Sequence, residues 1–272
     1  MTLQSSGSMT FADINNELRS SGTLVFPDTR TRWLAEVPSG NLILPTNFYS
    51  KQAVKLVHSA VDTVDRSGSY TFSSCDFGID YTGRTLVAVT ALFAGSDQVL
   101  SQTSVTIGGS SAAGGNNGDG DPAGGLVPAS AVGCGVWAAK PAGTSGSVVV
   151  NFTSGTAGAA ALYLFSLAGA ASATPHGQTS GITSDNPDFP SGDSGTLAVA
   201  ANGVVVGGVA RAVNTGAITL TGLTEVAQVT VDGSHRIVVG VANRLSVDAA
   251  YSVGFTTGSG NTVYAMRAAS FN

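Results

Sequence analysis

Residues 134–167 read CGVWAAKPAGTSGSVVVNFTSGTAGAAALYLFSL. Three segments of this stretch, 134–140, 147–153 and 160–167, are rich in β-branched, aromatic and small apolar residues. Gly, Pro, Ser and Thr separate the segments, and these residue types favour turns. Short segments of this composition, so closely spaced, predict successive β-strands. We expect the last of the three to be a buried strand followed by a turn.

The same pattern, short apolar and β-branched segments separated by turn residues, begins at about Val54 and continues toward the C-terminus. No helical pattern lies between the segments, which favours antiparallel strands over a parallel sheet. We therefore expect a mainly β protein whose body, residues 53–272, is an antiparallel β-sandwich of the jelly-roll type. We keep the body as one domain because either half alone would leave a sheet face bare. The other predicted strands lie in residues 85–94, 103–109, 202–213, 217–229, 234–243, 249–257 and 262–271.

Two stretches lack this pattern and are expected to be loops. Residues 110–125, SSAAGGNNGDGDPAGG, offer too little apolar surface to become ordered by burial, so we expect a mobile excursion over the sandwich. Residues 173–195 are rich in Gly, Pro, Ser and Asp and divide the β region into two halves.

The first 52 residues carry most of the helical pattern. Thr10 is a candidate N-cap because Asp13 follows three residues later. Phe11, Ile14 and Leu18 are spaced to share one face of a helix. A helix this short is not stable alone, so its apolar face needs a partner surface.

A second short helix is expected within residues 27–37, with Asp28 as its N-cap and Pro38 closing it. The start of the chain lacks the basic residues and the apolar run of a signal peptide, so we expect the segment to remain on the mature protein.

Composition excludes two classes of function. Only 11% of the 272 residues are charged and the net charge is −5, whereas nucleic-acid binding needs clustered Lys and Arg. The longest apolar run, residues 158–171, is shorter than the roughly 20 residues that cross a bilayer. We expect neither a nucleic-acid partner nor a membrane span.

The chain has two cysteines, Cys75 and Cys134. A disulfide between them is possible, but their separation in the sequence does not tell whether the two side chains come close enough in space to bond. Unpaired cysteines are commonly packed in a core, and that is the default interpretation.

One motif suggests hydrolysis. Residues 192–195 read GDSG, which resembles the surroundings of the chymotrypsin-like nucleophile, and His58 and Asp80 or Asp97 precede it in the same order. Against this, Thr196 stands where that motif has its last Gly, and His58 lies in KLVHSAVD. We interpret the motif as a turn that leads into a strand, and we expect no catalytic residues.

A metal site has little support. Asn117, Asp119 and Asp121 alternate like the first ligands of a calcium loop, but no Glu stands at the twelfth position. The three histidines lie far apart in the sequence, so a zinc site is not expected either. We expect no metal and no cofactor.

Carbohydrate binding is harder to exclude, because loops of a sandwich can present aromatic faces and carboxylates. The candidate residues are Tyr81, Trp137, Asp188 and Phe189. Trp137 alternates like a core residue of its strand, whereas Phe189 lies on a Pro-rich loop where either role is open.

The opening of the chain resembles a known signature. Residues 3–18, LQSSGSMTFADINNEL, resemble the leader of many tailed-bacteriophage structural proteins, and residues 37–52, VPSGNLILPTNFYSKQ, are similar to the phrase that ends that leader. The remainder resembles a Gly- and Ala-rich β domain of phage virion proteins. Its matching segments are TLVAVTALFAG (85–95), TSVTIGGSSA (103–112), GVWAAKPAGTSGSVVVNFT (135–153), ALYLFSLAGAASATP (161–175), LAVAANGVVVGGVA (197–210), LTGLTEV (220–226) and YAMRAASF (264–271).

This resemblance implies a minor structural protein of the virion, a tail-tip or fibre component assembled in the bacterial cytoplasm. It implies that the leader, residues 1–52, docks the protein to other virion subunits and that the body is displayed, where it can contact a glycan or protein of the host surface. A homo-oligomer is expected, with a trimer favoured by resemblance to other phage fibres. The polar loop 110–125 and residues 19–22 depart from the pattern, so a capsid decoration protein or head fibre remains an alternative, as does a carbohydrate-binding or hydrolytic sandwich.

The apolar side chains of the leader are the candidates for docking, because a short segment cannot bury them alone. The alternative is that they pack on the body of their own chain. The docking candidates are Phe11, Ile14, Leu18, Trp33, Leu34, Phe48 and Tyr49. The candidates for receptor contact are Asn117, Asp119, Asp121, Asp188 and Phe189.

Overall fold

Antiparallel sheets dominate the computed structural model, with 60% of the chain in strands and 8% in helices. This confirms the prediction of a mainly β protein, and face-to-face packing of the sheets is compatible with the expected sandwich. The jelly-roll form of the connections stays a prediction. The structure describes residues 3–18, 26–37, 39–48, 51–94, 100–120, 131–179, 183–184, 192–213, 216–258 and 263–272.

The first half of the body forms two sheets that pack face to face. Its strands are β1 (Val54–Asp62), β2 (Arg66–Asp76), β3 (Thr85–Ala94), β4 (Ser101–Ile107), β5 (Ser110–Ser111), β6 (Ala113–Gly120), β7 (Ala131–Ala139), β8 (Ser145–Ala157) and β9 (Ala159–Leu167). Sheet A has the order β1-β9-β3-β7-β6, and sheet B has the order β2-β8-β4-β5. Tyr70, Leu92 and Val150 belong to the core between them.

The second half also forms two sheets. Its strands are β10 (Gly177–Gln178), β11 (Thr183–Ser184), β12 (Gly192–Val199), β13 (Gly203–Arg211), β14 (Ile218–Thr221), β15 (Thr224–Val231), β16 (His235–Leu245), β17 (Asp248–Thr257) and β18 (Tyr264–Phe271). Sheet C has the order β10-β18-β13-β16-β15, with β11 also pairing with β18, and sheet D has the order β12-β17-β14. Val209, Phe255 and Met266 belong to the core between them.

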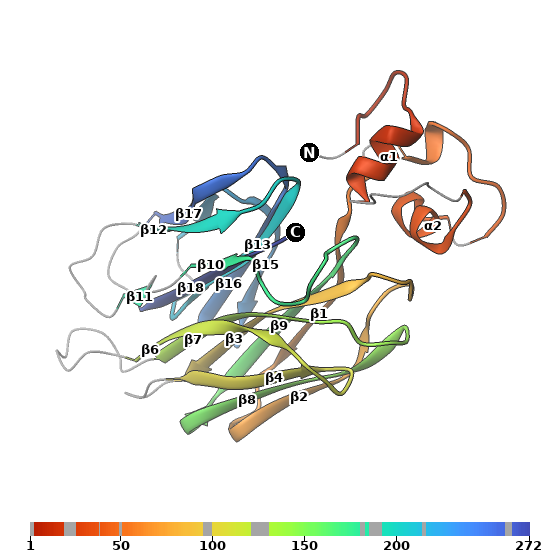
Figure 1. Ribbon diagram of the computed structural model, residues 1–272. Coiled ribbons are helices and arrows are strands. Elements are labelled where there is room, and N and C mark those ends of the chain that lie inside the picture. The colour runs from red at the N-terminus through yellow and green to blue at the C-terminus, as the bar shows by residue number, and fades with distance from the viewer. Residues whose placement is uncertain are drawn as a thin grey trace.

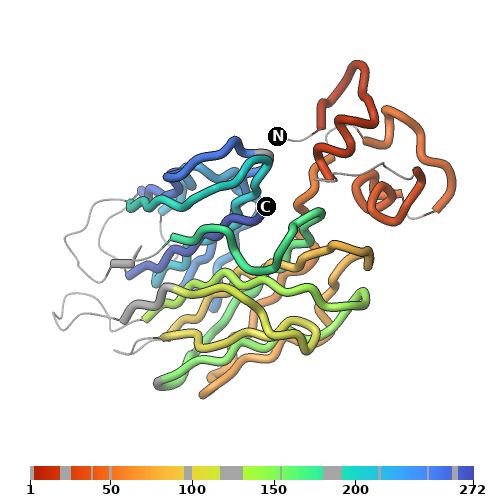
Figure 2. The backbone as a smooth tube through the Cα atoms, in the orientation of Figure 1, coloured from red at the N-terminus to blue at the C-terminus, as the bar shows by residue number. Residues whose placement is uncertain are grey.

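A third core joins the two halves, because side chains of sheet A and sheet C pack against each other. The body is therefore a stack of four layers in the order B, A, C, D (Figure 1). Each half on its own would leave one sheet face bare, and that face is covered by the other half. The smooth backbone trace shows the strands of all four layers running across the stack (Figure 2).

The position of each sheet in the stack explains its sequence pattern. Strands β3, β7 and β9 of sheet A are buried along their whole length, because layers cover both faces of this sheet. In β2, at the outside, Tyr70 and Phe72 are buried while Thr71 and Ser73 are exposed. Continuous apolar segments thus mark the central strands of the inner sheets, and alternating burial marks strands such as β2 that have one exposed face.

The two halves repeat one strand order. The order β10-β18-β13-β16-β15 in sheet C corresponds strand by strand to β1-β9-β3-β7-β6 in sheet A. In the same way, β12-β17-β14 in sheet D corresponds to β2-β8-β4 in sheet B. Apart from β5, each strand described in the first half therefore has a counterpart in the second.

The prediction of a loop at residues 110–125 is wrong for residues 110–120. Residues 110–111 form β5, and Ala113–Gly120 form β6, which pairs with β7 without a register shift. Glycine is required at this edge because a Cβ on Gly114, whose φ is +155°, would lie 2.1 Å from the carbonyl oxygen of Val136. Residues 121–125 lie outside the described residues.

Two other expectations are corrected. Residues 192–195 lie in strand β12 and not in the loop that was expected to extend to residue 195. The segment 217–229 is not one strand, because the chain leaves sheet D after β14 and enters sheet C at β15. Gly222 makes this change of sheet with a φ of +73°.

The leader forms short helices, α1 (Phe11–Glu17), α2 (Thr29–Ala35) and the 3₁₀ helix η1 (Thr46–Phe48). The predicted caps are confirmed. The Thr10 hydroxyl accepts from the Asp13 amide at 3.3 Å and the Asp13 carboxylate accepts from the Thr10 amide at 2.7 Å. Asp28 caps α2 through the amide of Thr31 at 2.7 Å. The predicted stop at Pro38 lies outside the described residues.

Candidate functional site

The leader folds around a small core of its own, at one end of the four-layer stack (Figure 1). Body residues Ala53, Tyr81 and Ala168 complete this core. The leader side chains in it include Ile14, Leu18, Trp33, Leu34 and Phe48, and each of these is no more than 4% exposed. Five of the predicted docking side chains are therefore covered by their own chain. Contact of these five with a partner was the wrong expectation, and the alternative of packing within the chain is what the structure shows.

Phe11 is the exception among the predicted docking residues that are described. Its side chain is 50% exposed, and its ring contacts that of Phe26 edge-to-face at 5.5 Å. Phe26 in turn lies 5.8 Å from the buried ring of Phe48. Ile43 of the leader is also exposed, at 58%, although the sequence pattern did not indicate it as a docking residue. Tyr49 lies outside the described residues.

Glu17, at the end of α1, fixes the leader to both halves of the body. Its carboxylate is fully buried, and Oε1 accepts hydrogen bonds from the amide of Ala53 at 2.6 Å and from Nδ2 of Asn243 at 2.8 Å. Ala53 precedes β1 of the first half and Asn243 lies in β16 of the second. A buried carboxylate is retained only where donors satisfy it, so this contact specifies one position of the leader.

Lys55 fixes the leader from the side of β1. Its Nζ donates to the carbonyl oxygens of Trp33 at 2.8 Å and Leu34 at 3.1 Å, and it pairs with Glu36 at 2.8 Å. These carbonyl groups end α2, where a cation is favourable. Burial lowers the pKa of Lys55, and Glu36 only partly opposes this shift. Burial alone would raise the pKa of Glu36, but hydrogen bonds from Lys51 and Lys55 hold it below its usual value.

A cleft of about 700 Å³ lies where the leader meets the second half of the body. Gln52 forms the leader side of the cleft, and the start of β15, the end of β16 and Tyr251 of β17 form the rest. The Tyr251 hydroxyl donates to the carbonyl oxygen of Gly222 at 2.6 Å, which fixes the ring at the cleft. The cleft joins residues of four separate segments, and no sequence pattern pointed to it. The lining residues are Gln52, Gly222, Leu223, Thr224, Glu225, Val226, Val241, Ala242, Asn243, Leu245 and Tyr251.

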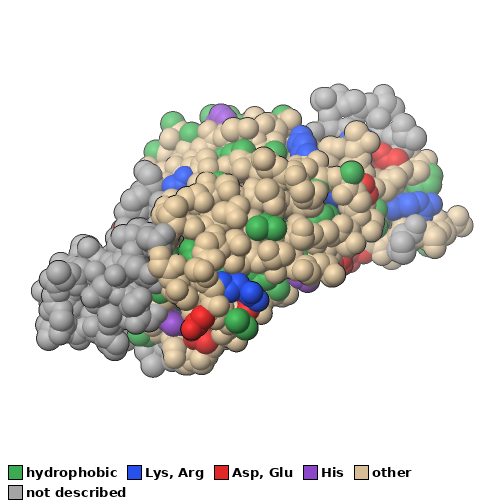
Figure 3. All heavy atoms as spheres, turned by 90° about the horizontal axis from the view of Figure 1, so that it is seen from below, with side chains coloured by type: hydrophobic (Ala, Val, Ile, Leu, Met, Phe, Trp, Pro, Cys, Tyr) green, Lys and Arg blue, Asp and Glu red, His purple; other side chains and the backbone are tan. Residues whose placement is uncertain are grey.

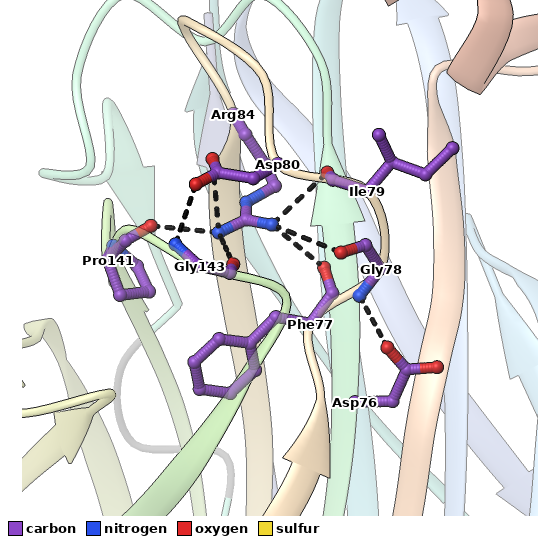
Figure 4. A network of polar contacts seen from close by, with 8 residues as sticks. All are labelled: Asp76, Phe77, Gly78, Ile79, Asp80, Arg84, Pro141 and Gly143. Carbon is purple, nitrogen blue, oxygen red and sulfur yellow. Dashed lines mark hydrogen bonds and ion pairs between the residues drawn. The ribbon is translucent and has the colours of Figure 1, made fainter. Parts of the chain in front are cut away.

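In the first half, the turn between β7 and β8 is held by Arg84, whose guanidinium donates to the carbonyl oxygens of Pro141 at 2.8 Å and Gly143 at 2.7 Å (Figure 4). The same group donates to three carbonyl oxygens of residues 77–79 at 3.1 to 3.4 Å and lies 3.6 Å from the Asp80 carboxylate. Burial lowers the pKa of Arg84, and Asp80 opposes the shift.

The exposed face of sheet B carries hydroxyl groups and few charges. Thr71 and Ser73 of β2 are exposed on it, as is Ser104 of β4. Figure 3 shows this face from below: uncharged polar side chains and backbone cover most of it, and the charged groups are few and scattered. Such a face offers hydrogen-bond donors and acceptors but no electrostatic field for an anionic or cationic partner.

The GDSG motif also lies on a hydroxyl-bearing face, that of sheet D. Ser194 borders a shallow hollow together with Thr221, Ser252 and Thr256. His58 lies in β1 of sheet A, which sheet C separates from sheet D. The structure therefore does not bring the serine and the histidine of the motif together, and Asp97 lies outside the described residues.

The structure assigns the remaining sugar-binding candidates to the interior or leaves them out. Trp137 is 7% exposed and its Nε1 donates to Gln102 at 2.9 Å, which confirms it as a core residue. Tyr81 is also 7% exposed and packs against Trp33. Asp121, Asp188 and Phe189 lie outside the described residues, and for Asn117 and Asp119 only the backbone is described, as part of β6.

The two cysteines are free and buried. Cys75 belongs to the core between sheets A and B, and Cys134 to the core between sheets A and C. Sheet A thus separates them. Burial raises the pKa of both thiols, that of Cys134 to about 12.

Among the residues that the structure describes, no three His, Cys, Asp or Glu side chains are grouped so that they could hold a metal ion. Within the same residues, no helix has the length and apolar character to cross a bilayer. No family model matches the chain, and neither a curated protein nor a solved structure shows significant similarity to it.

Proposed function

We propose that the chain is a structural protein of a tailed-bacteriophage virion, a tail-tip or fibre component that is docked through its leader and displays the β body. The proposal starts from the resemblance of the leader and the body to phage virion proteins. The observation that carries it is the attachment of the leader. A leader that is joined rigidly to the body can hold the body in a fixed position on a particle, and Glu17 and Lys55 join this leader to Ala53, β1 and β16.

The leader lies at one end of the stack, and β6 is labelled at the other end (Figure 1). A protein with this layout can be held at the leader end and present its other end. Phe11 and Ile43 are the large exposed apolar side chains of the described leader, so they replace the five buried residues as the docking contacts. Because each of these side chains is already about half buried, completing the burial of both contributes about 1.5–3 kcal/mol.

Incorporation into particles tests the proposal. In phage that carry the double variant Phe11→Ser, Ile43→Ser, we expect the amount of the protein per purified particle to fall at least about tenfold, since 1.4 kcal/mol already corresponds to that factor. Val64→Ser is the matched control, because Val64 is 56% exposed but belongs to the turn after β1. Absence of the wild-type protein from purified particles contradicts the proposal outright.

Antibody labelling of the same particles decides between two locations. Labelled tails support the tail-tip or fibre assignment, and labelled heads support the alternative of a capsid decoration protein or head fibre. The trimer is tested by light scattering on the purified protein, with a mass of about three times the 27.0 kDa of one chain as the expected result.

The carbohydrate-binding alternative has an observation of its own in favour, the cleft beside Tyr251. For the hydrolytic alternative, the test is reaction with a serine-directed fluorophosphonate that disappears in Ser194→Ala. We expect no such reaction, since His58 is in another layer of the stack.

A further inference from the structure

We propose that the cleft between the leader and sheets C and D binds a neutral saccharide. This inference does not depend on where the protein sits in a particle, because it rests on the cleft alone. The first argument is size: a cleft of about 700 Å³ falls within the range of about 300–1,000 Å³ that is typical of small-ligand sites.

The second argument is the chemistry of the lining. Tyr251 supplies an aromatic surface, which is suited to the apolar face of a sugar ring. Glu225, Gln52 and Thr224 supply a carboxylate, an amide and a hydroxyl, which pair with sugar hydroxyls. Glu225 is the charged residue of the described lining, and no Lys or Arg is part of it, so an anionic ligand would be repelled.

The third argument is that a strand irregularity shapes the cleft. The register between β15 and β16 shifts between Glu225 and Ala227, so Val226 has no partner in the ladder. A β-bulge of this kind turns side chains out of their regular positions and is frequent beside binding sites. Val226 is 38% exposed and lines the cleft.

Direct binding to the full-length protein tests the inference. The probes are neutral oligosaccharides, namely hexamers of α-1,4-glucose, β-1,4-glucose and β-1,4-N-acetylglucosamine and a rhamnose oligomer, titrated calorimetrically. Polygalacturonate and poly(glycerol phosphate) are the anionic counterparts. We expect at least one neutral probe to bind, the anionic probes not to bind, and Glu225→Gln to weaken the binding at least about tenfold.

Two further variants separate loss of the site from loss of the fold. Val226→Trp fills the cleft without removing a polar contact, and we expect it to abolish binding while the unfolding midpoint stays unchanged. Thr256→Ala, on the face of sheet D away from the cleft, is the control and should bind like the wild type.

Three results overturn the inference. These are the failure of every neutral probe to bind, binding that neither Glu225→Gln nor Val226→Trp alters, and tighter binding of the anionic probes. A dimer that Val226→Trp dissociates also overturns it, because a second copy of the chain would then be the occupant of the cleft.

Discussion

Glu17 and Asn243 are hydrogen-bonded at 2.8 Å although 226 positions separate them in the chain. The first helix is thereby tied to a strand of the second half, and the same carboxylate oxygen also holds the amide of Ala53. The leader is thus part of the folded unit, although its core is separate from the three cores of the body.

Replacing Glu17 by Ala should loosen the leader before it affects the body. The change removes the Glu17 acceptor from the buried backbone amide of Ala53 and from the part-buried side-chain amide of Asn243, at a cost of about 2–3 kcal/mol. We expect trypsin to cut at Arg30 or Arg32 at least about tenfold faster than in the wild type, which gel electrophoresis over time would show. Glu225→Ala is the control, because Glu225 is exposed and its loss should leave the cutting rate unchanged. Equal rates for wild type and Glu17→Ala would mean that the contact does not hold the leader.

Arg84 should be among the most costly single residues to replace. Arg84→Ala leaves five carbonyl groups without a donor, and we expect a loss of about 3 kcal/mol in the free energy of unfolding, measured by urea denaturation. Arg84→Lys should recover only part of this, because an ammonium group cannot span the same set of acceptors. Arg66→Ala is the matched control, since the Arg66 side chain is 43% exposed and its pair with Asp62 is worth less than about 1 kcal/mol.

A pair of glycines separates backbone strain from steric contact. Gly222 and Gly233 have similar φ values, +73° and +78°. A Cβ added to Gly222 would lie 2.2 Å from the carbonyl oxygen of Ser252, whereas a Cβ added to Gly233 would have no atom within 4 Å. We expect Gly233→Ala to lower the free energy of unfolding by about 1 kcal/mol, the ordinary cost of a side chain at positive φ. Gly222→Ala should cost about 2 kcal/mol more, because β17 must shift. Equal costs in urea denaturation would show that the contact at Ser252 is unimportant.

Cys134 should make the protein less stable in alkali. Burial raises the pKa of its thiol to about 12 from a usual value of 9.0, so the folded state holds this proton more tightly than the unfolded state. Its contribution is therefore fully present below pH 9 and is lost as the pH rises toward 12. We expect the free energy of unfolding to fall between pH 9 and pH 11, and to fall less steeply in Cys134→Ala. Parallel curves for the two proteins would contradict this assignment.

Much of the fold could be predicted from local patterns. Apolar and β-branched segments predicted the strands β3, β7 and β9, of which β9 was expected to be buried, and the side chains of Thr10 and Asp28 predicted both helix starts. These features depend on residues that are close in the sequence. The preferences of those residues for strand or helix therefore agree with the final structure.

The errors arose where distant contacts decide the structure. Strand β6 is made of Ala, Gly, Asn and Asp, residues with low preference for strands, and it forms because β7 offers it an edge. The spacing of the apolar residues in α1 could not tell whether this face packs against another subunit or against the rest of the same chain. Its cover comes from Ala53, Tyr81 and Ala168, which no local pattern connects with it.

The cleft could not be predicted for the same reason. It needs Gln52, the bulge at Val226 and Tyr251 to meet, and these residues lie on three segments that come together only in the fold. The bulge is not visible in the sequence of β15, TEVAQVTV, which is that of an ordinary strand. The contacts that Arg84 makes with the turn between β7 and β8 are likewise not visible in the sequence, because Pro141 and Gly143 lie 57 and 59 positions away from it.

The core shared by sheets A and C sets the shortest fragment that can be produced. Cutting the chain between the halves would leave Val89, Phe165 and their neighbours without cover on one piece and Val206 and Val239 on the other. We expect both pieces to aggregate through these uncovered faces, so a shortened version of the protein should keep sheets A and C together.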